Sequence, residues 1–316
     1  MRIQLKKGFL IGLVICGMFC EQSLYAFELD PTLVDNDKIL LNLNNADLKI
    51  KVGDKNQIIL QQGSFQEKFS SEKKEGLLRI TQNLFEKEKL NIELTLKPHL
   101  FLEVHQKEGA ITATKLLKET YLNLSKGKIS ISSSSAPLNL HQLRGEVNLK
   151  DQTGKTFVDS YSANITVENI SADLEIQNFS GNSIVENSKS DFTAFQNQGL
   201  LKIVNHQGSL NFDLNKAQLN AQKISGRIDG QSSEGVINLI PNDDVDINVR
   251  LKSGKLNIQS GQMTGGSLNV STTDGDIYLP NPIKTNGAKS FRGRFGNANS
   301  KASIFARSQD AIIQIK

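Results

Sequence analysis

Apolar and polar residues follow a nine-residue repeat from Gly127 to Leu239. Each block opens on a small residue, and apolar residues stand two and four positions later, as in Gly127-Lys-Ile129-Ser-Ile131. Thirteen consecutive blocks fit this template, with openers at Gly127, Ala136, Gly145, Gly154, Ala163, Ala172, Gly181, Ser190, Gly199, Gly208, Ala217, Gly226 and Gly235. Among the positions two and four places after these openers, the residues that are not apolar are Thr156, Ser183 and Gly230.

Alternation over five positions is typical of a β-strand that buries one face. A short fixed period with turn residues between strands is typical of a solenoid, in which stacked repeats share one long core. Small openers suit the corners, because glycine adopts backbone angles that other residues avoid. The pattern therefore predicts an all-β fold with a single, parallel β-helix-like solenoid.

Two blocks, or eighteen residues, are the expected length of one coil of this solenoid. Leu143, Tyr161 and Phe179 recur at this interval, so we expect an apolar corner that points inward once per coil. Ile170 breaks that pattern, and coils of twenty-seven residues remain an alternative. Four asparagines share one corner position of the block: Asn169, Asn178, Asn187 and Asn205. Asparagine is common at turns and in stacked side-chain ladders.

The rest of the chain divides around this repeat. Residues 27–126 are predicted to form irregular strands that cap the first coil, with a polar loop at residues 63–75. Residues 127–240 are the regular repeat. Residues 241–316 supply C-terminal coils and closing strands, with a long loop at residues 283–300. Because the pattern is continuous, we expect one domain after the N-terminal segment.

Residues 1–26 have the features of a secretory signal peptide. Basic residues at the start precede an apolar run from Gly8 to Phe19, and Leu24-Tyr25-Ala26 matches a cleavage site that ends in alanine. The run is too short for a typical membrane span. We expect cleavage after Ala26 and export to the periplasm, the outer envelope or the extracellular space.

Lipid attachment at Cys16 or Cys20 is the alternative to ordinary cleavage. Lipoprotein processing requires a small residue before the cysteine, but Ile15 and Phe19 stand there. Ordinary cleavage removes both cysteines, so the mature chain is expected to have no disulfide. It also removes three of the 37 basic and one of the 33 acidic residues, which leaves 34 minus 32, or +2. This balance argues against nucleic-acid binding.

Three stretches carry a pattern beyond the regular repeat. The first is Leu90-Asn-Ile-Glu-Leu-Thr-Leu-Lys-Pro98, followed by Leu102-Glu-Val104 and Gly109-Ala-Ile-Thr-Ala113. The second pairs Ser253-Gly-Lys-Leu-Asn-Ile258 with Thr273-Asp-Gly-Asp-Ile-Tyr-Leu279. The third is Phe291-Arg-Gly-Arg-Phe-Gly296, which two expected strands follow.

With these stretches the chain resembles the bacterial putative-adhesin family of β-strand repeat proteins, whose members have repeated Gly-x-Φ-x-Φ units (Φ, apolar). The resemblance covers most of the mature chain and implies an all-β repeat fold with a role in adhesion. It supplies no motif of catalytic residues. The chain departs from the common ending at Gln309-Asp310-Ala311, where a Ser-Gly-Asp turn is frequent.

Motifs for metals, nucleotides and covalent catalysis are absent from the sequence. His99, His105, His141 and His206 have no metal-ligand spacing, and we expect each to lie on a strand surface. The repeat lacks the paired glycine and the aspartate of calcium-binding nonapeptides. It contains no phosphate-binding glycine loop and no nucleophile elbow. The sequence therefore predicts no cofactor and no metal.

A polysaccharide-cleaving site on a β-helix would need paired carboxylates on adjacent coils. Asp173 and Glu175 are expected to point outward, and Asp191 lies eighteen residues after Asp173. Outward acids are expected on any solvated strand face. We therefore predict that the protein is not an enzyme.

Basic residues gather near the C-terminus, and they are the weak candidates for a polyanion contact. They are Lys284, Lys289, Arg292 and Arg294, with Lys301 and Arg307 nearby. Such a group suits the phosphates or acidic glycans of an envelope. The simpler interpretation is a solvated loop.

The working hypothesis is an exported, non-enzymatic binding protein with an adhesive or envelope-surface role. Its expected partner is a surface glycan, an envelope component or a protein. A structural scaffold of the periplasm or outer envelope is the first alternative, and a polysaccharide-active enzyme is the second. The ligand and the oligomeric state do not follow from the sequence.

Overall fold

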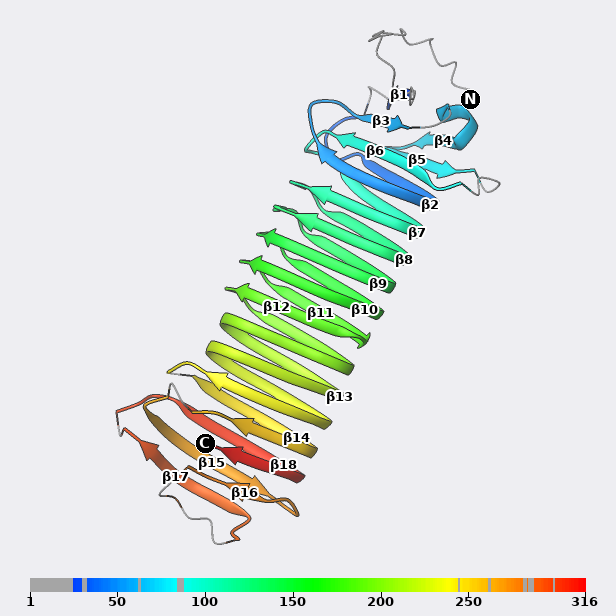
Figure 1. Cartoon of the computed structure of the whole chain (residues 1–316). Coiled ribbons are helices and arrows are strands. Elements are labelled where there is room, and N and C mark those ends of the chain that lie inside the picture. Colours follow the sequence, from blue (N-terminus) through cyan, green and yellow to red (C-terminus); the bar gives the residue numbers. More distant parts are fainter. Residues whose placement is uncertain are drawn as a thin grey trace, which may run out of the picture.

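The structure is a computed structural model. The residues that it describes are 25–29, 33–61, 64–83, 88–243, 245–260, 263–280, 283, 287–297 and 299–316. The protein is all-β, as the alternating pattern predicts, and the eighteen strands of the described residues belong to one mixed sheet. The strands stack across the long axis of an elongated molecule, with the chain running from one end to the other (Figure 1). Within these ranges, the helix α1 (Phe65–Lys68) is the one helix.

The N-terminal strands are β1 (Tyr25–Glu28), β2 (Lys38–Val52), β3 (Gln57–Leu60), β4 (Phe69–Lys74), β5 (Leu77–Gln82) and β6 (Leu90–Leu96). The central strands are β7 (Phe101–Thr114), β8 (Thr120–Ser132), β9 (Leu138–Gln152), β10 (Thr156–Ile170), β11 (Leu174–Ser180), β12 (Asn182–Ser188) and β13 (Phe192–Pro241). The C-terminal strands are β14 (Asp246–Ile258), β15 (Gly265–Thr272), β16 (Ile277–Tyr278), β17 (Ser290–Gly296) and β18 (Ser303–Ile315).

Successive strands of the central stack pair in parallel at a fixed offset of eighteen residues. Leu102 pairs with Thr120, Thr120 with Leu138, and Leu138 with Thr156. The same offset joins β10 to β11 and β12, and these strands to β13. The pairing offset in these strands is therefore eighteen residues, not twenty-seven, and one such circuit is called a coil below.

The two ends of the stack depart from this offset. At the C-terminal end, β14 pairs with β13 at an offset of nineteen, as in Arg227 with Asp246. The strand order then becomes β14–β18–β15–β17, because β18 returns to lie between β14 and β15. At the N-terminal end, β2 pairs with β7 across an intervening segment that contains β3 to β6. Strands that are distant in sequence therefore lie side by side at both ends (Figure 1).

The core is a continuous column of inward-facing aliphatic side chains. Ile129 and Ile131, the apolar pair of the first block, are buried, as are the corresponding residues of the later coils. Each fully buried side chain of this size contributes about 1.5–3 kcal/mol. No single coil buries its apolar pair alone, so the stacking of coils supplies the stability.

Glycine openers allow the backbone of neighbouring coils to approach closely at one corner. Gly127 has a φ of +141°, and a Cβ atom there would lie 1.8 Å from the carbonyl oxygen of Gly109 in the preceding coil. Gly145 repeats this arrangement above Gly127. Only a residue without a side chain avoids this contact at that backbone conformation.

The inward-pointing corner position holds a polar residue in most coils, although Leu124, Leu214 and Leu251 occupy it in three of them. The apolar residues of the predicted column are not the ones that turn inward, which corrects the sequence prediction. Leu143, Tyr161 and Phe179 point outward and are about half exposed. The residue before each of them turns inward instead, and Gln142 donates hydrogen bonds to the carbonyl oxygens of Gly127 and Arg144. Where glutamine or asparagine stands at this position, its amide satisfies a corner carbonyl inside the core, as also seen for Gln106 and Gln196.

The predicted asparagine corner is present for three of the four residues. Asn169, Asn187 and Asn205 have φ angles between 56° and 59°, and the amide of each later one donates to the side-chain oxygen of the one before, at 3.2 and 2.8 Å. Asn178 lies instead at the inward corner, where its amide contacts the oxygen of Ala163 and the hydroxyl of Ser183. The prediction for Asn178 was wrong because a nine-residue count superimposes two different corners of an eighteen-residue coil.

Two segments predicted as loops contain regular structure. The segment at residues 63–75 holds α1 and β4, since Phe65 and Phe69 pack on one another and Phe65 stacks on Phe27 at 4.2 Å between ring centroids. The segment at residues 283–300 holds β17, which pairs antiparallel with β15. The two final strands expected after it form one strand, β18.

His206 is buried in the core, which corrects the expectation of a surface position. Its Nδ1 atom lies 2.6 Å from the hydroxyl of Ser188 at the same position of the preceding coil. Burial lowers the pKa of His206 below its ordinary value, although a hydrogen bond with the backbone of Ser209 and the charge of Asp191 oppose this shift. The small Ser188 side chain leaves room for the ring inside the coil.

The predicted signal peptide lies mostly outside the described residues. Of residues 1–26, only Tyr25 and Ala26 are described, at the start of β1, which pairs antiparallel with β3. Cys16 and Cys20 are outside the described ranges as well. Signal cleavage and lipid attachment both stay predictions.

Replacing Gly127 with alanine should destabilise the stack strongly. We expect Gly127→Ala to lower the free energy of unfolding by about 2 kcal/mol or more, because the new methyl group strikes the carbonyl of Gly109. The matched control is Gly287→Ala, where φ is +77° but no atom lies within 4 Å of the new Cβ. This control should cost about 1 kcal/mol. Denaturant unfolding followed by circular dichroism measures both, and equal costs would contradict the close approach.

Acidification should destabilise the fold through His206. The folded state disfavours protonation of this imidazole, so its contribution to stability is complete above the ordinary histidine pKa of about 6.5 and declines as the pH falls below that value. In the variant Ser188→Ala/His206→Leu, unfolding midpoints between pH 7.5 and 5 should change less than in the parent. His99→Gln, at an exposed position, is the control and should keep the parent pH dependence.

Candidate functional site

One outer face of the stack carries aromatic side chains on successive coils. These residues, called the aromatic face, are Tyr121, His141, Phe157, Tyr161, Phe179 and Phe195. They occupy outward positions of β8, β9, β10, β11 and β13, on the strand segment that precedes the glycine corner. The eighteen-residue register brings together rings that are far apart in the sequence.

Ring contacts link these side chains from coil to coil. Tyr121 contacts His141 with 5.1 Å between ring centroids, and His141 contacts Phe157 edge-on at 5.8 Å. Tyr161 and Phe179 stack in parallel planes with centroids 5.0 Å apart. In the next coil Asn197 takes the position of Phe179, so Phe179 is the last ring of this stack.

The rings stand well out from the surface. Tyr161, Phe179 and Phe195 are 53%, 48% and 42% exposed. Single exposed apolar residues are normal on soluble proteins, but a contiguous exposed apolar patch marks an interaction site. The fold does not require aromatic residues in the column of Tyr161 and Phe179, since Asn197 and Asn215 occupy this column one and two coils after Phe179 and bond to one another at 2.8 Å.

Three shallow hollows of about 350 to 370 Å³ follow one another along this face. The first is lined by Leu143, Tyr161 and Phe179, and the second by Phe179, Phe195 and Asp213. The third shares Phe195 and Asp213 with the second. Shared lining residues make the three hollows continuous. From Asn123 to Arg250 they span eight adjacent coils, three of them formed by β13, or about 34 Å for seven spacings of 4.8 Å.

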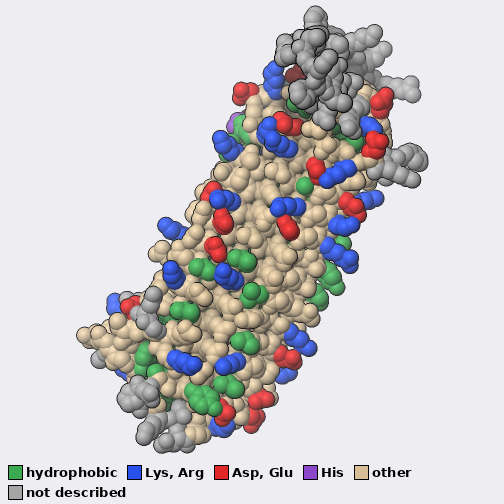
Figure 2. Space-filling view, in the orientation of Figure 1, with side chains coloured by type: hydrophobic (Ala, Val, Ile, Leu, Met, Phe, Trp, Pro, Cys, Tyr) green, Lys and Arg blue, Asp and Glu red, His purple; other side chains and the backbone are tan. Residues whose placement is uncertain are grey.

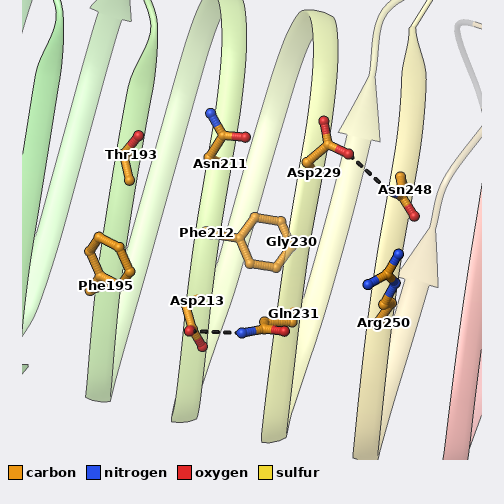
Figure 3. A pocket seen from close by; sticks show the side chains of 10 residues that line it. All are labelled: Thr193, Phe195, Asn211, Phe212, Asp213, Asp229, Gly230, Gln231, Asn248 and Arg250. Carbon is orange, nitrogen blue, oxygen red and sulfur yellow. Dashed lines mark hydrogen bonds between the residues drawn. The ribbon is translucent and has the colours of Figure 1, made fainter.

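Amide and carboxylate side chains line the third hollow on the strands that follow Phe195 (Figure 3). Gln231 donates to Asp213 at 2.9 Å, and Asn248 donates to Asp229 at 2.9 Å. Partial burial raises the pKa of Asp229, but hydrogen bonds from Arg227 and Asn248 outweigh this effect and hold it below its ordinary value. The hollow thus presents an ionised carboxylate and amide groups that are already oriented.

A ring from one coil fills the space of a missing side chain in the next. Gly230 stands at an inward position, and the Phe212 ring lies over it (Figure 3). A Cβ atom at Gly230 would lie 2.3 Å from that ring. This packing explains why Gly230 departs from the apolar repeat, and it forms the floor of the third hollow.

Three of the four basic residues predicted near the C-terminus, Lys289, Arg292 and Arg294, lie on β17 or directly before it. Lys284 is outside the described residues. The ammonium group of Lys289 donates to the carbonyl oxygens of Asp274 and Gly275, at 3.1 and 2.6 Å. Arg292 and Arg294 lie together on the outward side of β17 and are exposed. Sequence reasoning missed Arg250, whose place beside them depends on strand order.

The candidate acids occupy open positions. Asp173 and Asp191 lie on neighbouring coils and are both exposed, as their spacing predicts. The carboxylate of Glu175 accepts a hydrogen bond from Gln177 at 2.7 Å. None of these three lines the hollows of the aromatic face. No group of three or more His, Cys, Asp or Glu side chains in the described ranges is placed to hold a metal ion.

The surface charge is mixed. Basic and acidic side chains alternate along the side of the stack in Figure 2, with hydrophobic side chains between them. The part of the chain that the structure covers holds no helix of the length and hydrophobicity that a membrane crossing needs.

Comparison with known proteins yields distant similarities. No protein-family model and no curated protein matches this chain. A putative cell adhesion protein from Clostridium sporogenes ATCC 15579 is 12% identical over 93% of this chain and 98% of that chain, with a TM-score of 0.20. A putative lipid binding protein from Parabacteroides distasonis ATCC 8503 is 13% identical over 93% and 97%, with a TM-score of 0.34. A putative adhesin from Bacteroides fragilis NCTC 9343 is 11% identical over 94% and 98%, with a TM-score of 0.36. At these values the similarities define neither a family nor a ligand for this chain.

The packing of Phe212 against Gly230 can be tested by a double-mutant cycle. Gly230→Val should cost about 1–3 kcal/mol because the new side chain collides with the ring. Phe212→Ala alone should cost about 3–5 kcal/mol through the cavity it leaves. Together the two changes should cost less than their sum, since valine occupies part of that cavity. Additive costs in denaturant unfolding would contradict this contact.

Proposed function

We propose that this protein is an exported β-solenoid that binds an extended partner along its aromatic face and catalyses no reaction. The observation that carries this proposal is the continuous line of hollows with exposed rings at Tyr161, Phe179 and Phe195. Exposed aromatic surface of this kind costs solubility and is retained where a partner covers it. A solenoid offers a long, rigid surface that suits such a contact.

A polymer chain fits this face better than a compact small molecule. The hollows are shallow and open, and they continue for about 34 Å. Aromatic rings accept the apolar C–H side of a sugar ring, while the intervening amide and carboxylate groups bond to hydroxyls. A surface glycan or another envelope polymer is therefore the proposed class of partner.

The non-enzymatic interpretation has support from the carboxylates of the face. Asp213 and Asp229 both accept side-chain hydrogen bonds, from Gln231 and from Asn248. The bonds from Arg227 and Asn248 hold the pKa of Asp229 below its ordinary value, whereas a general acid needs a raised pKa. These groups suit ligand binding.

The proposed site of action is the cell envelope or its outer surface, on the basis of the signal-like segment at residues 1–26. An adhesin would work outside the cell, and a structural scaffold would work inside the envelope. Protease digestion of intact cells, followed with an antibody to the mature chain, separates the two. Digestion is the result expected for an adhesin, and protection until the outer envelope is opened would contradict that role.

Removing the exposed rings should abolish binding and leave the fold intact. We expect the triple variant Tyr161→Ser/Phe179→Ser/Phe195→Ser to lose at least about tenfold in binding to isolated envelope polysaccharide, because aromatic anchors dominate such contacts. The control is Tyr278→Ser, which removes a 53% exposed ring from β16, away from the aromatic face. Pull-down on immobilised envelope fractions measures both. Equal binding by the triple variant and the control would contradict the proposal.

A further inference from the structure

The unusual strand order at the C-terminal end gathers arginines from three strands on one surface. These residues, called the arginine cluster, are Arg250 on β14, Arg307 on β18, and Arg292 and Arg294 on β17. Arg250 pairs with Arg307 in register, and Arg307 pairs with Ser271 of β15. On the other edge of β15, Arg292 pairs with Asn269. Register partners in adjacent strands project to the same side of a sheet.

The burial of neighbouring residues shows that the arginine cluster lies on the outer side of the sheet. Val249 and Leu251 flank Arg250 and are buried, and Ala306 beside Arg307 is buried too. In β17, Phe291 and Phe295 pack against the core, so Arg292 and Arg294 between them point away from it. All four guanidinium groups therefore lie on the outer face that also carries the aromatic rings.

The arginine cluster continues the line of hollows directly. Arg250 lines the third hollow together with Gln231 and Asn248 (Figure 3). From β14 to β17 the cluster extends across three strand spacings, or about 14 Å. The aromatic face and the arginine cluster are therefore two parts of one surface.

Positive charge is concentrated on these strands, and Asp229 of the neighbouring strand β13 interacts electrostatically with Arg250. Like charges directly opposite one another in a sheet are destabilising, and Arg250 and Arg307 are such a pair. Among the described outward residues of these four strands on this side, Asp246 is the one acid, and it accepts a hydrogen bond from Ser303. A bound anion would relieve this repulsion.

Two of the four guanidinium groups are held in place. The Arg307 guanidinium lies 4.6 Å from the centre of the Phe305 ring. Arg294 donates to the carbonyl oxygen of Ser300 at 2.9 Å. Orientation before binding lowers the entropy cost of forming hydrogen bonds to a planar carboxylate.

The remainder of the face has the opposite charge. Asp159, Glu175 and Asp213 are outward residues of the coils that carry the rings. A polymer with a charge on every unit, such as a nucleic acid, would meet repulsion there. A polymer in which acidic and neutral sugars alternate can place its neutral sugars on the rings and an acidic sugar at the arginines.

We propose that the arginine cluster binds the carboxylate of an acidic polysaccharide whose neutral sugars lie on the aromatic face. This inference rests on the proposed function, because it assigns a charge to the polymer that the aromatic face is proposed to bind. Arginine forms paired hydrogen bonds with a carboxylate, and the two neighbouring guanidinium groups of Arg250 and Arg307 present these donors side by side.

The test uses the full mature chain and hyaluronate oligosaccharides, in which carboxylated and neutral sugars alternate. Hyaluronate with its carboxyl groups reduced to alcohols is the uncharged probe of the same backbone. We expect the charged form to bind at least about tenfold more tightly in calorimetric titration, with a difference that shrinks as salt increases. Equal affinity for the two forms, or no binding of hyaluronate, would overturn the proposal.

The variants separate the arginine cluster from general positive charge. Arg250→Gln/Arg307→Gln should lose about tenfold in affinity for hyaluronate and a much smaller factor in affinity for the reduced form, because glutamine still offers hydrogen bonds to hydroxyls. Arg144→Gln, an exposed arginine at a corner of β9, is the control and should bind as the parent does. If Arg250→Gln/Arg307→Gln binds hyaluronate as the parent does, the arginine cluster is not the site.

The outcomes distinguish this inference from the proposed function. If the variant Tyr161→Ser/Phe179→Ser/Phe195→Ser loses binding and Arg250→Gln/Arg307→Gln does not, the aromatic face binds a polymer but the arginine cluster does not bind its carboxylate. If the parent chain binds neither envelope polysaccharide nor hyaluronate, both the proposed function and the proposed acidic ligand are contradicted. Circular dichroism of each variant separates loss of a contact from loss of the fold.

Discussion

Parallel pairing at an offset of eighteen residues is the constraint on which the rest of this structure depends. It stacks each glycine corner on the one before, so that Gly127 lies above Gly109 and Gly145 above Gly127. It also aligns the inward side chains into one column. A slip by a single residue would turn every core side chain to solvent. The close approach at glycine corners such as Gly127 opposes such a slip, because only glycine fits there with a positive φ.

The corners also decide which side chains are free for binding. Gln142 and Asn178 point inward because their amides satisfy backbone carbonyls of the corner. Their neighbours Leu143 and Phe179 then point outward, where the fold places few demands on them. Aromatic residues at such positions contribute little to the core, so their exposure is a property of the surface and supports a role in binding.

Charge varies along this surface because the two ends of the stack are built differently from its middle. The middle coils follow one another in sequence and carry rings with carboxylates. At the C-terminal end, β18 inserts between β14 and β15, and this order puts Arg307 next to Arg250. The polymer that suits such a surface is neutral over the rings and acidic at the arginines.

The sequence by itself determined the all-β fold, the buried pairs such as Ile129 and Ile131, and the small corner openers, because a local period specifies strands and turns. It placed Leu143, Tyr161 and Phe179 in one column but gave them the wrong direction. Direction at a corner depends on which neighbour satisfies the backbone carbonyls, and that requires the preceding coil. The burial of His206 and the packing of the Phe212 ring over Gly230 also depend on the adjacent coil, because Ser188 and Gly230 there leave space for a ring. The arginine cluster depends on strand order, since Arg250 and Arg307 are 57 residues apart and meet only through the return of β18.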